Sequence, residues 1–149
     1  MANTSETISP VTTLTGLIRE IRPWQWYKQG VMLLGIVFSK NLLNWDAWLT
    51  LLIGIMSFTT VASATYIFND ISDLEEDRSQ PKKQHRPIAS GQVSVSVAVV
   101  FGIILASIGL GAAYSLGPLF LAVLLAYLTQ NALYSLGLKQ FMFVDVLII

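Results

Sequence analysis

The sequence predicts an all-α protein, a polytopic bundle of transmembrane helices, from its composition and from the spacing of its apolar runs. Of its 149 residues, 54% are hydrophobic and 12% are charged, and the mean hydropathy is +0.62. Apolar runs of roughly 20 residues, enough to cross a bilayer, recur along the chain, and most charged residues lie between them. The net charge of zero gives no electrostatic basis for binding nucleic acid, and the lack of cysteine excludes disulfides and thiolate metal sites.

The order of these runs predicts a tail, an interfacial helix and a series of spans. Residues 1–13 are rich in Ser and Thr and are predicted to be a disordered tail, followed by one domain over 14–149. Residues 14–27 interleave apolar and charged side chains, which predicts an amphipathic interfacial helix broken near Pro23. Transmembrane spans are predicted at about 29–43, 48–68, 93–114 and 118–136, with the start of a fifth at 141–149. We therefore expect the N-terminal part of a larger bundle, truncated after about four helices.

The distribution of lysine and arginine predicts the orientation in the membrane. If the N-terminus faces inward, only Lys40 of the nine Lys and Arg residues lies on the outer side. Short loops rich in positive charge stay on the cytoplasmic side of a membrane. We therefore expect an integral protein of the inner or plasma membrane, with its N-terminus and its acidic loop in the cytoplasm.

The acidic loop follows the second predicted span and contains the candidate catalytic and metal-binding residues. If the helix continues into this loop, Asp70, Asp73 and Asp77 stand at i, i+3 and i+7, within about 60° of one another around its axis. Asn69 joins this face through its i+4 relation to Asp73, whereas Glu75 points to the opposite side. Converging carboxylates repel one another unless a cation lies among them, and oxygen ligands suit Mg²⁺. The pattern predicts a Mg²⁺ site that binds a phosphorylated substrate.

Cations follow the carboxylates directly, and further polar residues end the fourth predicted span. A solvated loop alone has no need for metal ligands beside phosphate-binding cations, so this pairing favours a diphosphate site. Beyond that span, an anion binder and an additional carboxylate are expected at the same cytoplasmic surface. The candidate substrate-binding residues from both regions are Asn69, Lys28, Arg78, Lys83, Arg86, Tyr134, Lys139 and Asp145.

Together these motifs resemble the UbiA superfamily of intramembrane prenyltransferases. The resemblance lies in Asn69-Asp70-x-x-Asp73-x-x-x-Asp77, and in Tyr134-x-x-x-x-Lys139 with Asp145. Within the superfamily, the branch of decaprenyl-phosphate phosphoribosyltransferases is the most similar. The stretches that indicate this branch are Arg22-Pro23-x-Gln25-Trp26-x-Lys28 and Asp77-Arg78-x-x-Pro81-x-Lys83-x-x-Arg86-Pro87-Ile88-Ala89-Ser90-Gly91.

The resemblance implies a helical bundle around a central cavity, with Mg²⁺ at its cytoplasmic mouth. It implies that Asp70, Asp73 and Asp77 bind Mg²⁺ and the diphosphate with the help of Asn69. The implied phosphate contacts are Lys28, Arg78, Lys83, Arg86 and Lys139.

The resemblance also implies the reaction and leaves two alternatives open. The expected reaction is transfer of phosphoribosyl from phosphoribosyl pyrophosphate to a polyprenyl phosphate, so the expected partners are a polyprenyl lipid, a phosphorylated small molecule and membrane lipids. One alternative is transfer of a polyprenyl group from its diphosphate to an aromatic acceptor. The other is a non-catalytic membrane protein whose acidic loop binds a cation or a partner. A small transporter is disfavoured, because the ionisable residues gather at one mouth of the bundle rather than deep within a span.

Overall fold

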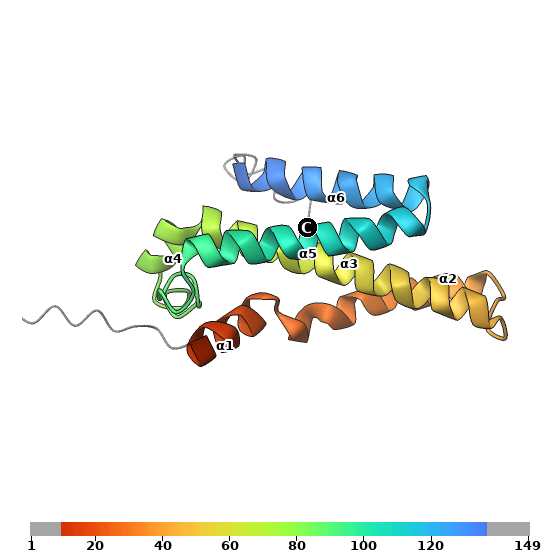
Figure 1. Ribbon diagram of the computed structural model, residues 1–149, viewed down its shortest axis with the longest axis horizontal. Helices are drawn as coiled ribbons and strands as arrows, with labels where there is room; N and C mark the ends of the chain where they lie inside the picture. The colour runs from red at the N-terminus through yellow and green to blue at the C-terminus, as the bar shows by residue number, and fades with distance from the viewer. Residues whose placement is uncertain (1–9, 137–149) are drawn as a thin grey trace, which may run out of the picture.

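The protein is a bundle of antiparallel helices in the computed structural model, which describes residues 10–136. Within that range every regular element is a helix, which confirms the all-α prediction (Figure 1). The elements, of which η1 is a 3₁₀ helix, are α1 (Pro10–Glu20), η1 (Pro23–Met32), α2 (Leu33–Phe38), α3 (Trp45–Ser72), α4 (Leu74–Ser79), α5 (Val95–Ser115) and α6 (Pro118–Leu136).

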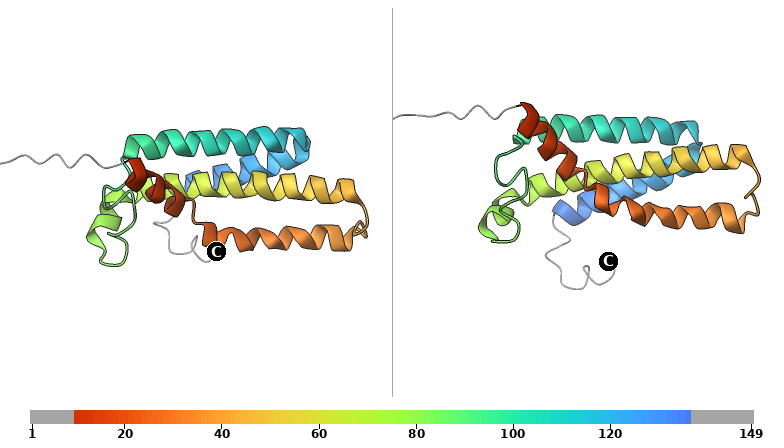
Figure 2. Two further views of the ribbon diagram at one scale, coloured as in Figure 1. Left: turned by 60° about the horizontal axis from the view of Figure 1, so that its bottom comes forward. Right: turned by 90° about the horizontal axis from the view of Figure 1, so that it is seen from below.

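The long helix α3 is the centre of the bundle. Figure 2 shows α5 along one side of α3 and the η1–α2 segment along another, with α1 crossing the end at which α3 leads into α4. The helix α6 packs against both α3 and α5. Residues from the two ends of the described chain therefore meet beside the last turns of α3.

The helices begin where the sequence supplies caps. The side chain of Asn44 accepts hydrogen bonds from the backbone N–H groups of Asp46 and Ala47, at 3.0 and 3.3 Å, and so caps α3. Ser94 caps α5 in the same way. The turn into α6 passes through Gly117 at φ +110°, a backbone conformation that favours glycine.

Glycines bring α3 and α5 into close contact. A Cβ at Gly109 would lie 2.5 Å from a methyl group of Val61 and 2.8 Å from the carbonyl oxygen of Ser57. The hydroxyl of Ser57 also donates to the carbonyl oxygen of Gly109 at 2.7 Å. Further along, a Cβ at Gly102 would meet the ring of Phe68 at 3.0 Å. Small residues at such crossings let membrane helices approach closely.

Replacing Gly109 by alanine is expected to destabilise the bundle. The new methyl group has no room against Val61, and overpacking of this kind costs about 1–3 kcal/mol. Thermal unfolding of the detergent-solubilised protein measures the loss. Gly111 is the matched control, because a Cβ there has nothing within 4 Å, so Gly111→Ala should leave the unfolding temperature unchanged or higher. Equal effects of the two substitutions would contradict the close packing.

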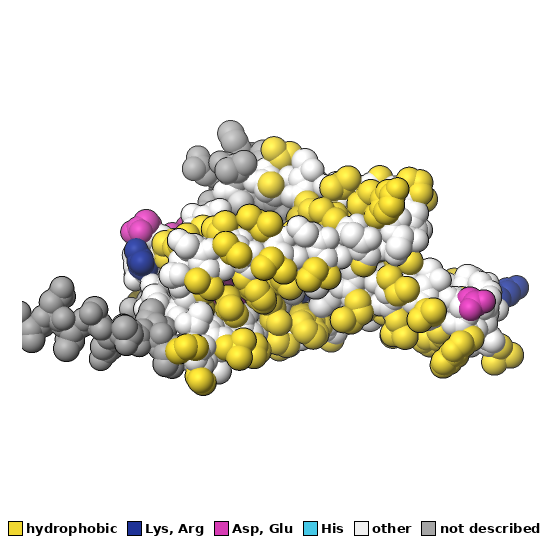
Figure 3. Space-filling view, in the orientation of Figure 1, with side chains coloured by type: hydrophobic (Ala, Val, Ile, Leu, Met, Phe, Trp, Pro, Cys, Tyr) yellow, Lys and Arg dark blue, Asp and Glu magenta, His cyan; other side chains and the backbone are white. Residues whose placement is uncertain are grey.

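Three of the described helices are long and apolar enough to cross a membrane. They are α3, α5 and residues 118–135 of α6, which contain 18-residue stretches with mean hydropathies of 1.7, 2.4 and 1.2. On the face drawn in Figure 3, hydrophobic side chains cover the middle of the molecule and the charged side chains gather at its two ends. This distribution matches an apolar membrane core between two polar surfaces, and the protein is an integral membrane protein.

The stretch 29–43, predicted as the first span, does not form one α-helix. It contains the end of η1, then α2, then a turn through Lys40 at φ +58°. The ten residues of η1 and the six of α2 rise about 29 Å together, because a 3₁₀ helix rises about 2.0 Å per residue and an α-helix about 1.5 Å. The same residues in an α-helix would rise only about 24 Å. The greater rise per residue of the 3₁₀ helix gives this short segment nearly the thickness of a hydrocarbon core, about 30 Å.

Candidate functional site

The candidate site lies at the charged end of the bundle, where α3 ends. The helix stops at Ser72, Asp73 joins it to α4, and the chain then turns back through residues 80–93 toward α5. The junction between α1 and η1 approaches the same place from the other side (Figure 2). Three separate segments therefore supply side chains to this end.

Two arginines neutralise the buried carboxylate of Asp70. Its side chain is 4% exposed, and Nη2 of Arg22 lies 2.6 and 2.8 Å from its two oxygens. Nη1 of Arg86 lies 2.9 Å from Oδ1 of the same carboxylate. One arginine already balances the charge of Asp70, so the second can also serve another carboxylate.

Arg86 also joins Asp70 to Asp77, seven residues further along. The same Nη1 atom that contacts Asp70 lies 2.6 Å from Oδ2 of Asp77, which is fully buried. The other oxygen, Oδ1, lies 3.6 Å from Nζ of Lys83, and among the described residues it accepts no hydrogen bond. The i and i+7 carboxylates thus converge on a guanidinium, although α3 ends at Ser72 and does not continue through Asp77 as the spacing argument assumed.

Arg22 holds its position in a strained backbone conformation. Its φ of 49° and ψ of 61° lie in the left-handed region, which non-glycine residues seldom adopt. The guanidinium also lies over the ring of Tyr66, 4.9 Å from its centroid. Such strain persists where surrounding contacts fix it, and it clusters at functional sites. The sequence analysis used Arg22 only as part of a motif, and this geometry makes it a candidate site residue.

Glu20, at the end of α1, is a second residue that sequence reasoning missed. It is 2% exposed, and its Oε1 accepts a hydrogen bond from the backbone N–H of Ile88 at 3.0 Å. Burial, together with a hydrogen bond to Asp70 and the negative charge of that residue, raises the pKa of Glu20 from 4.5 to about 8. No sequence signal distinguishes Glu20 from an ordinary polar residue of an amphipathic helix, because its partners lie about 50 and 70 residues away in the chain.

Replacing Glu20 by glutamine is expected to reduce the pH dependence of stability. Because the folded protein holds the Glu20 proton up to about pH 8 and the unfolded chain only to 4.5, stability falls as the pH rises between these values. A glutamine side chain can still accept from the N–H of Ile88, but it does not titrate. Unfolding temperatures of the metal-free protein from pH 4.5 to 8 should therefore vary less in Glu20→Gln. An unchanged pH profile would contradict the raised pKa.

The remaining predicted residues are spread around this centre. Asn69 accepts a hydrogen bond from the hydroxyl of Ser135 on α6, beside a cavity of about 220 Å³ between α3 and α6. Lys28 is exposed and donates to Gln25 at 3.3 Å, away from the carboxylates. Asp73 lies at the α3–α4 junction and Tyr134 lies on α6. The side chain of Arg78 donates to Glu75 and to the carbonyl oxygen of Ala89. Lys139 and Asp145 lie outside the described residues.

The oxygen atoms of these carboxylates are suitable ligands for a divalent cation, but the described residues do not form a complete coordination site. Asp70 and Asp77 already share one positive group, and Asp77 Oδ1 is a buried oxygen that accepts no hydrogen bond from residues 10–136. Oxygen donors of this kind are what Mg²⁺ prefers. In the described part of the chain, however, no three acidic or histidine side chains are grouped closely enough to enclose a metal ion. A metal ion would therefore have to take the place of the Arg86 guanidinium.

A pocket of about 310 Å³ opens beside Asp70, and we call it the basic pocket. Asp70 and Glu20, which are both buried, line it as well. Its cationic walls come from α1, from the start of η1 and from the loop before α5. The basic residues that line it are Arg19, Arg22, Lys82, His85 and Arg86.

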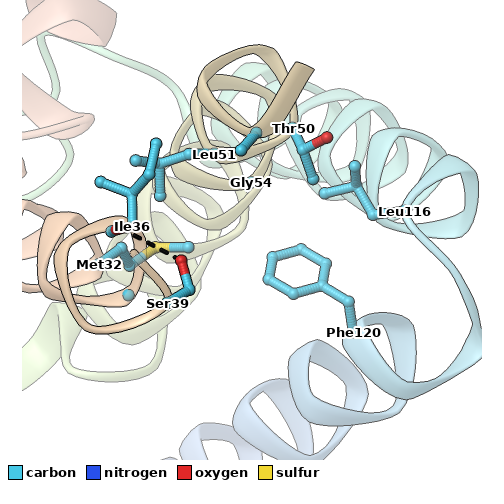
Figure 4. A pocket seen from close by; sticks show the side chains of 10 residues that line it. Met32, Ile36, Ser39, Thr50, Leu51, Gly54, Leu116 and Phe120 are labelled. Atoms are coloured by element: carbon cyan, nitrogen blue, oxygen red, sulfur yellow. Dashed lines mark hydrogen bonds between the residues drawn. The ribbon is translucent and has the colours of Figure 1, made fainter. Parts of the chain in front are cut away.

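A second pocket, of about 370 Å³, lies at the opposite end of the bundle. Figure 4 shows Met32 and Ile36 on one side of it and Phe120 on the other, with Gly54 of α3 between them. Its lining is mainly apolar, and it is separated from Asp70 by most of the length of α3. It therefore does not belong to the charged site.

Fold and site define an integral membrane protein with an arginine-bridged pair of carboxylates at one end of a helical bundle. The model of the UbiA prenyltransferase family matches residues 30–149. The chain belongs to this family, as its motifs suggested.

Three curated relatives show how the similarity is distributed. The chain is 31% identical over 144 residues to the decaprenyl-phosphate phosphoribosyltransferase of Mycobacterium tuberculosis, covering 94% of this chain and 48% of the relative. It is 33% identical over 132 residues to protein y4nM of Sinorhizobium fredii, covering 89% of this chain and 26% of the relative. It is 32% identical over 83 residues to the digeranylgeranylglyceryl phosphate synthase of Sulfolobus acidocaldarius, covering 52% and 30%. The chain thus spans about half the length of these relatives or less.

Proposed function

We propose that the complete protein is a Mg²⁺-dependent transferase that moves phosphoribosyl from phosphoribosyl pyrophosphate to a polyprenyl phosphate in the membrane. The observation that carries this proposal is the convergence of two buried carboxylates, Asp70 and Asp77, on one cation beside the basic pocket. The similarity to decaprenyl-phosphate phosphoribosyltransferase over 94% of the chain supports this donor and this acceptor. In this proposal the charged end faces the cytoplasm of an inner or plasma membrane, where phosphorylated metabolites are available.

The carboxylates would hold the metal ion and the arginines would hold the diphosphate. Asp70, Asp73 and Asp77 are the proposed metal ligands, with Asn69 beside them. When bound, Mg²⁺ supplies positive charge to the leaving diphosphate. Arg22 and Arg86, which neutralise the carboxylates in this structure, would then be released to donate to diphosphate oxygens.

The basic residues contribute most where negative charge develops. Cleavage of the donor leaves charge on the diphosphate, and fixed cations stabilise that charge as it grows. We assign this task to Arg86 and Lys83, which form ion pairs with Asp77, and further phosphate contacts to Arg78, Lys28 and Lys139. Tyr134 and Asp145 are proposed to complete the site from the side of α6. The polyprenyl phosphate is already ionised, so the reaction needs no protein base to activate it.

Metal dependence is the first test of this function. Membranes that contain the complete protein are incubated with labelled phosphoribosyl pyrophosphate and polyprenyl phosphate, in EDTA or with added Mg²⁺. We expect labelled lipid only with Mg²⁺. Full turnover in EDTA would overturn the assignment of Asp70, Asp73 and Asp77 as metal ligands.

Prenyl transfer to an aromatic acceptor is the second candidate. It is supported by the similarity, over a shorter stretch, to the protoheme IX farnesyltransferase of Baumannia cicadellinicola, 28% identical over 80 residues. Product from a prenyl diphosphate and an aromatic acceptor, with none from phosphoribosyl pyrophosphate, would establish it in place of the first. A non-catalytic role for the acidic loop predicts instead that Asp73→Asn leaves transferase activity unchanged.

A further inference from the structure

The basic pocket contains more positive groups than the carboxylates beside it require. Arg22 is paired with Asp70, and Arg86 is paired with both Asp70 and Asp77. The other basic residues of its wall, Arg19, Lys82 and His85, have no hydrogen-bond or ion-pair partner for their side chains among residues 10–136. All three are exposed, so a ligand from solution can reach them.

The charge of the pocket favours an anion. Four Lys and Arg side chains line it, against the two buried carboxylates of Glu20 and Asp70. The lining is positive even when both carboxylates are ionised. A concave surface of one sign of charge concentrates ligands of the opposite sign.

We propose that the wall of the basic pocket formed by Arg19, Lys82 and His85 binds a phosphate monoester, beside the diphosphate assigned to Asp70, Asp73 and Asp77. The inference rests on the proposed function and specifies its substrates. A monoester is close to doubly charged at pH 7 and offers three acceptor oxygens, which match the unused donors of Arg19, Lys82 and His85. The volume of about 310 Å³ lies at the lower end of the range for small-molecule sites, which suits a compact polar group rather than a long apolar chain.

A monoester site distinguishes between the two candidate reactions. Phosphoribosyl transfer involves two monoesters, the 5-phosphate of the donor sugar and the phosphate of the acceptor lipid. Transfer of a prenyl group from its diphosphate to an aromatic acceptor requires neither of them. The pocket therefore favours the first reaction, on grounds independent of the similarity to relatives.

Binding measurements can separate the monoester site from the diphosphate site. Calorimetric titration of the solubilised protein with ribose 5-phosphate in EDTA should show binding, because the pocket is made of cations and needs no metal. Arg19→Gln and Lys82→Gln should each weaken this binding by about three- to tenfold. Lys40→Gln is the matched control: it removes one exposed positive charge at the far end of the bundle, and binding should be unchanged.

A parallel titration with farnesyl phosphate in lipid nanodiscs tests whether the monoester belongs to the lipid. Binding of either probe that depends on Lys82 supports the proposal and identifies the source. Absence of binding by both probes, or binding that Arg19→Gln and Lys82→Gln leave unchanged, overturns it.

A different measurement, the Mg²⁺ dependence of pyrophosphate binding, tests the proposed function. It requires that Mg²⁺-dependent binding of pyrophosphate is lost in Asp73→Asn, whereas monoester binding in EDTA should persist in the same variant. If Asp73→Asn removes monoester binding as well, there is one shared site and the separate pocket is wrong. If monoester binding persists but pyrophosphate binding never needs Mg²⁺, the proposed function fails and the pocket remains.

Discussion

Replacing Asp70 by asparagine is expected to abolish transferase activity in the complete protein and to destabilise the fold. The substitution leaves Arg22 and Arg86 facing each other across a neutral side chain, in a position where Asp70 is only 4% exposed. Breaking a buried ion pair costs about 3–5 kcal/mol, and the partial exposure of both arginines places this case toward the lower end. Loss of a metal ligand lowers turnover further, by about 100-fold or more.

Turnover and thermal unfolding measure the two effects of Asp70→Asn separately. Glu75→Gln is the matched control, since it removes one acidic charge from α4 that is 85% exposed and paired only with Arg78 in the described structure. Exposed ion pairs contribute about 0–1 kcal/mol, so this variant should keep its stability and activity. A fully active Asp70→Asn would remove Asp70 from the proposed metal site.

Replacing Arg86 by glutamine is expected to be the most destabilising change at the charged end. Arg86 is the closest partner of Asp77, which would be left buried with only Lys83 at 3.6 Å. We expect a loss of about 3–5 kcal/mol in the free energy of unfolding. Arg86→Lys should recover part of it, because an ammonium restores the charge but not the planar group that reaches two carboxylates.

The double variant Arg86→Gln with Asp77→Asn isolates the contribution of this pair. Removing both partners leaves no unpaired buried charge, so the double variant should be more stable than Arg86→Gln alone by about 1 kcal/mol or more. Thermal unfolding in detergent gives all three values. If the two changes simply add, Arg86 and Asp77 do not interact as the structure places them.

The fold class and the family could be predicted from the sequence because both depend on local patterns. Apolar runs such as the one in α5 are continuous and long, and they need no knowledge of distant contacts. The spacing of Asp70 and Asp77 is also local, and the structure brings both residues to one guanidinium. Spacing could not predict that this positive group belongs to Arg86, because Arg86 lies in a loop, where no helical periodicity relates it to Asp70 and Asp77.

Other features of the site depend on contacts between distant segments. Glu20 and Arg22 reach Asp70 only because α1 ends and the backbone turns into the left-handed region before η1. The 3₁₀ winding of η1 was not predicted either, since the side chains of residues 23–32 suit an α-helix or a 3₁₀ helix equally in composition.

The 3₁₀ winding of η1 determines how far apart the two ends of this segment lie and how they are rotated about its axis. If its ten residues adopted the ordinary α-helical form, the segment would shorten by about 5 Å and its ends would rotate against each other by about 200°. Arg22 at one end could not follow such a screw motion and keep its contact with Asp70. The contact between Arg22 and Asp70 is therefore compatible with the 3₁₀ form of η1 and not with an α-helical form of the same segment.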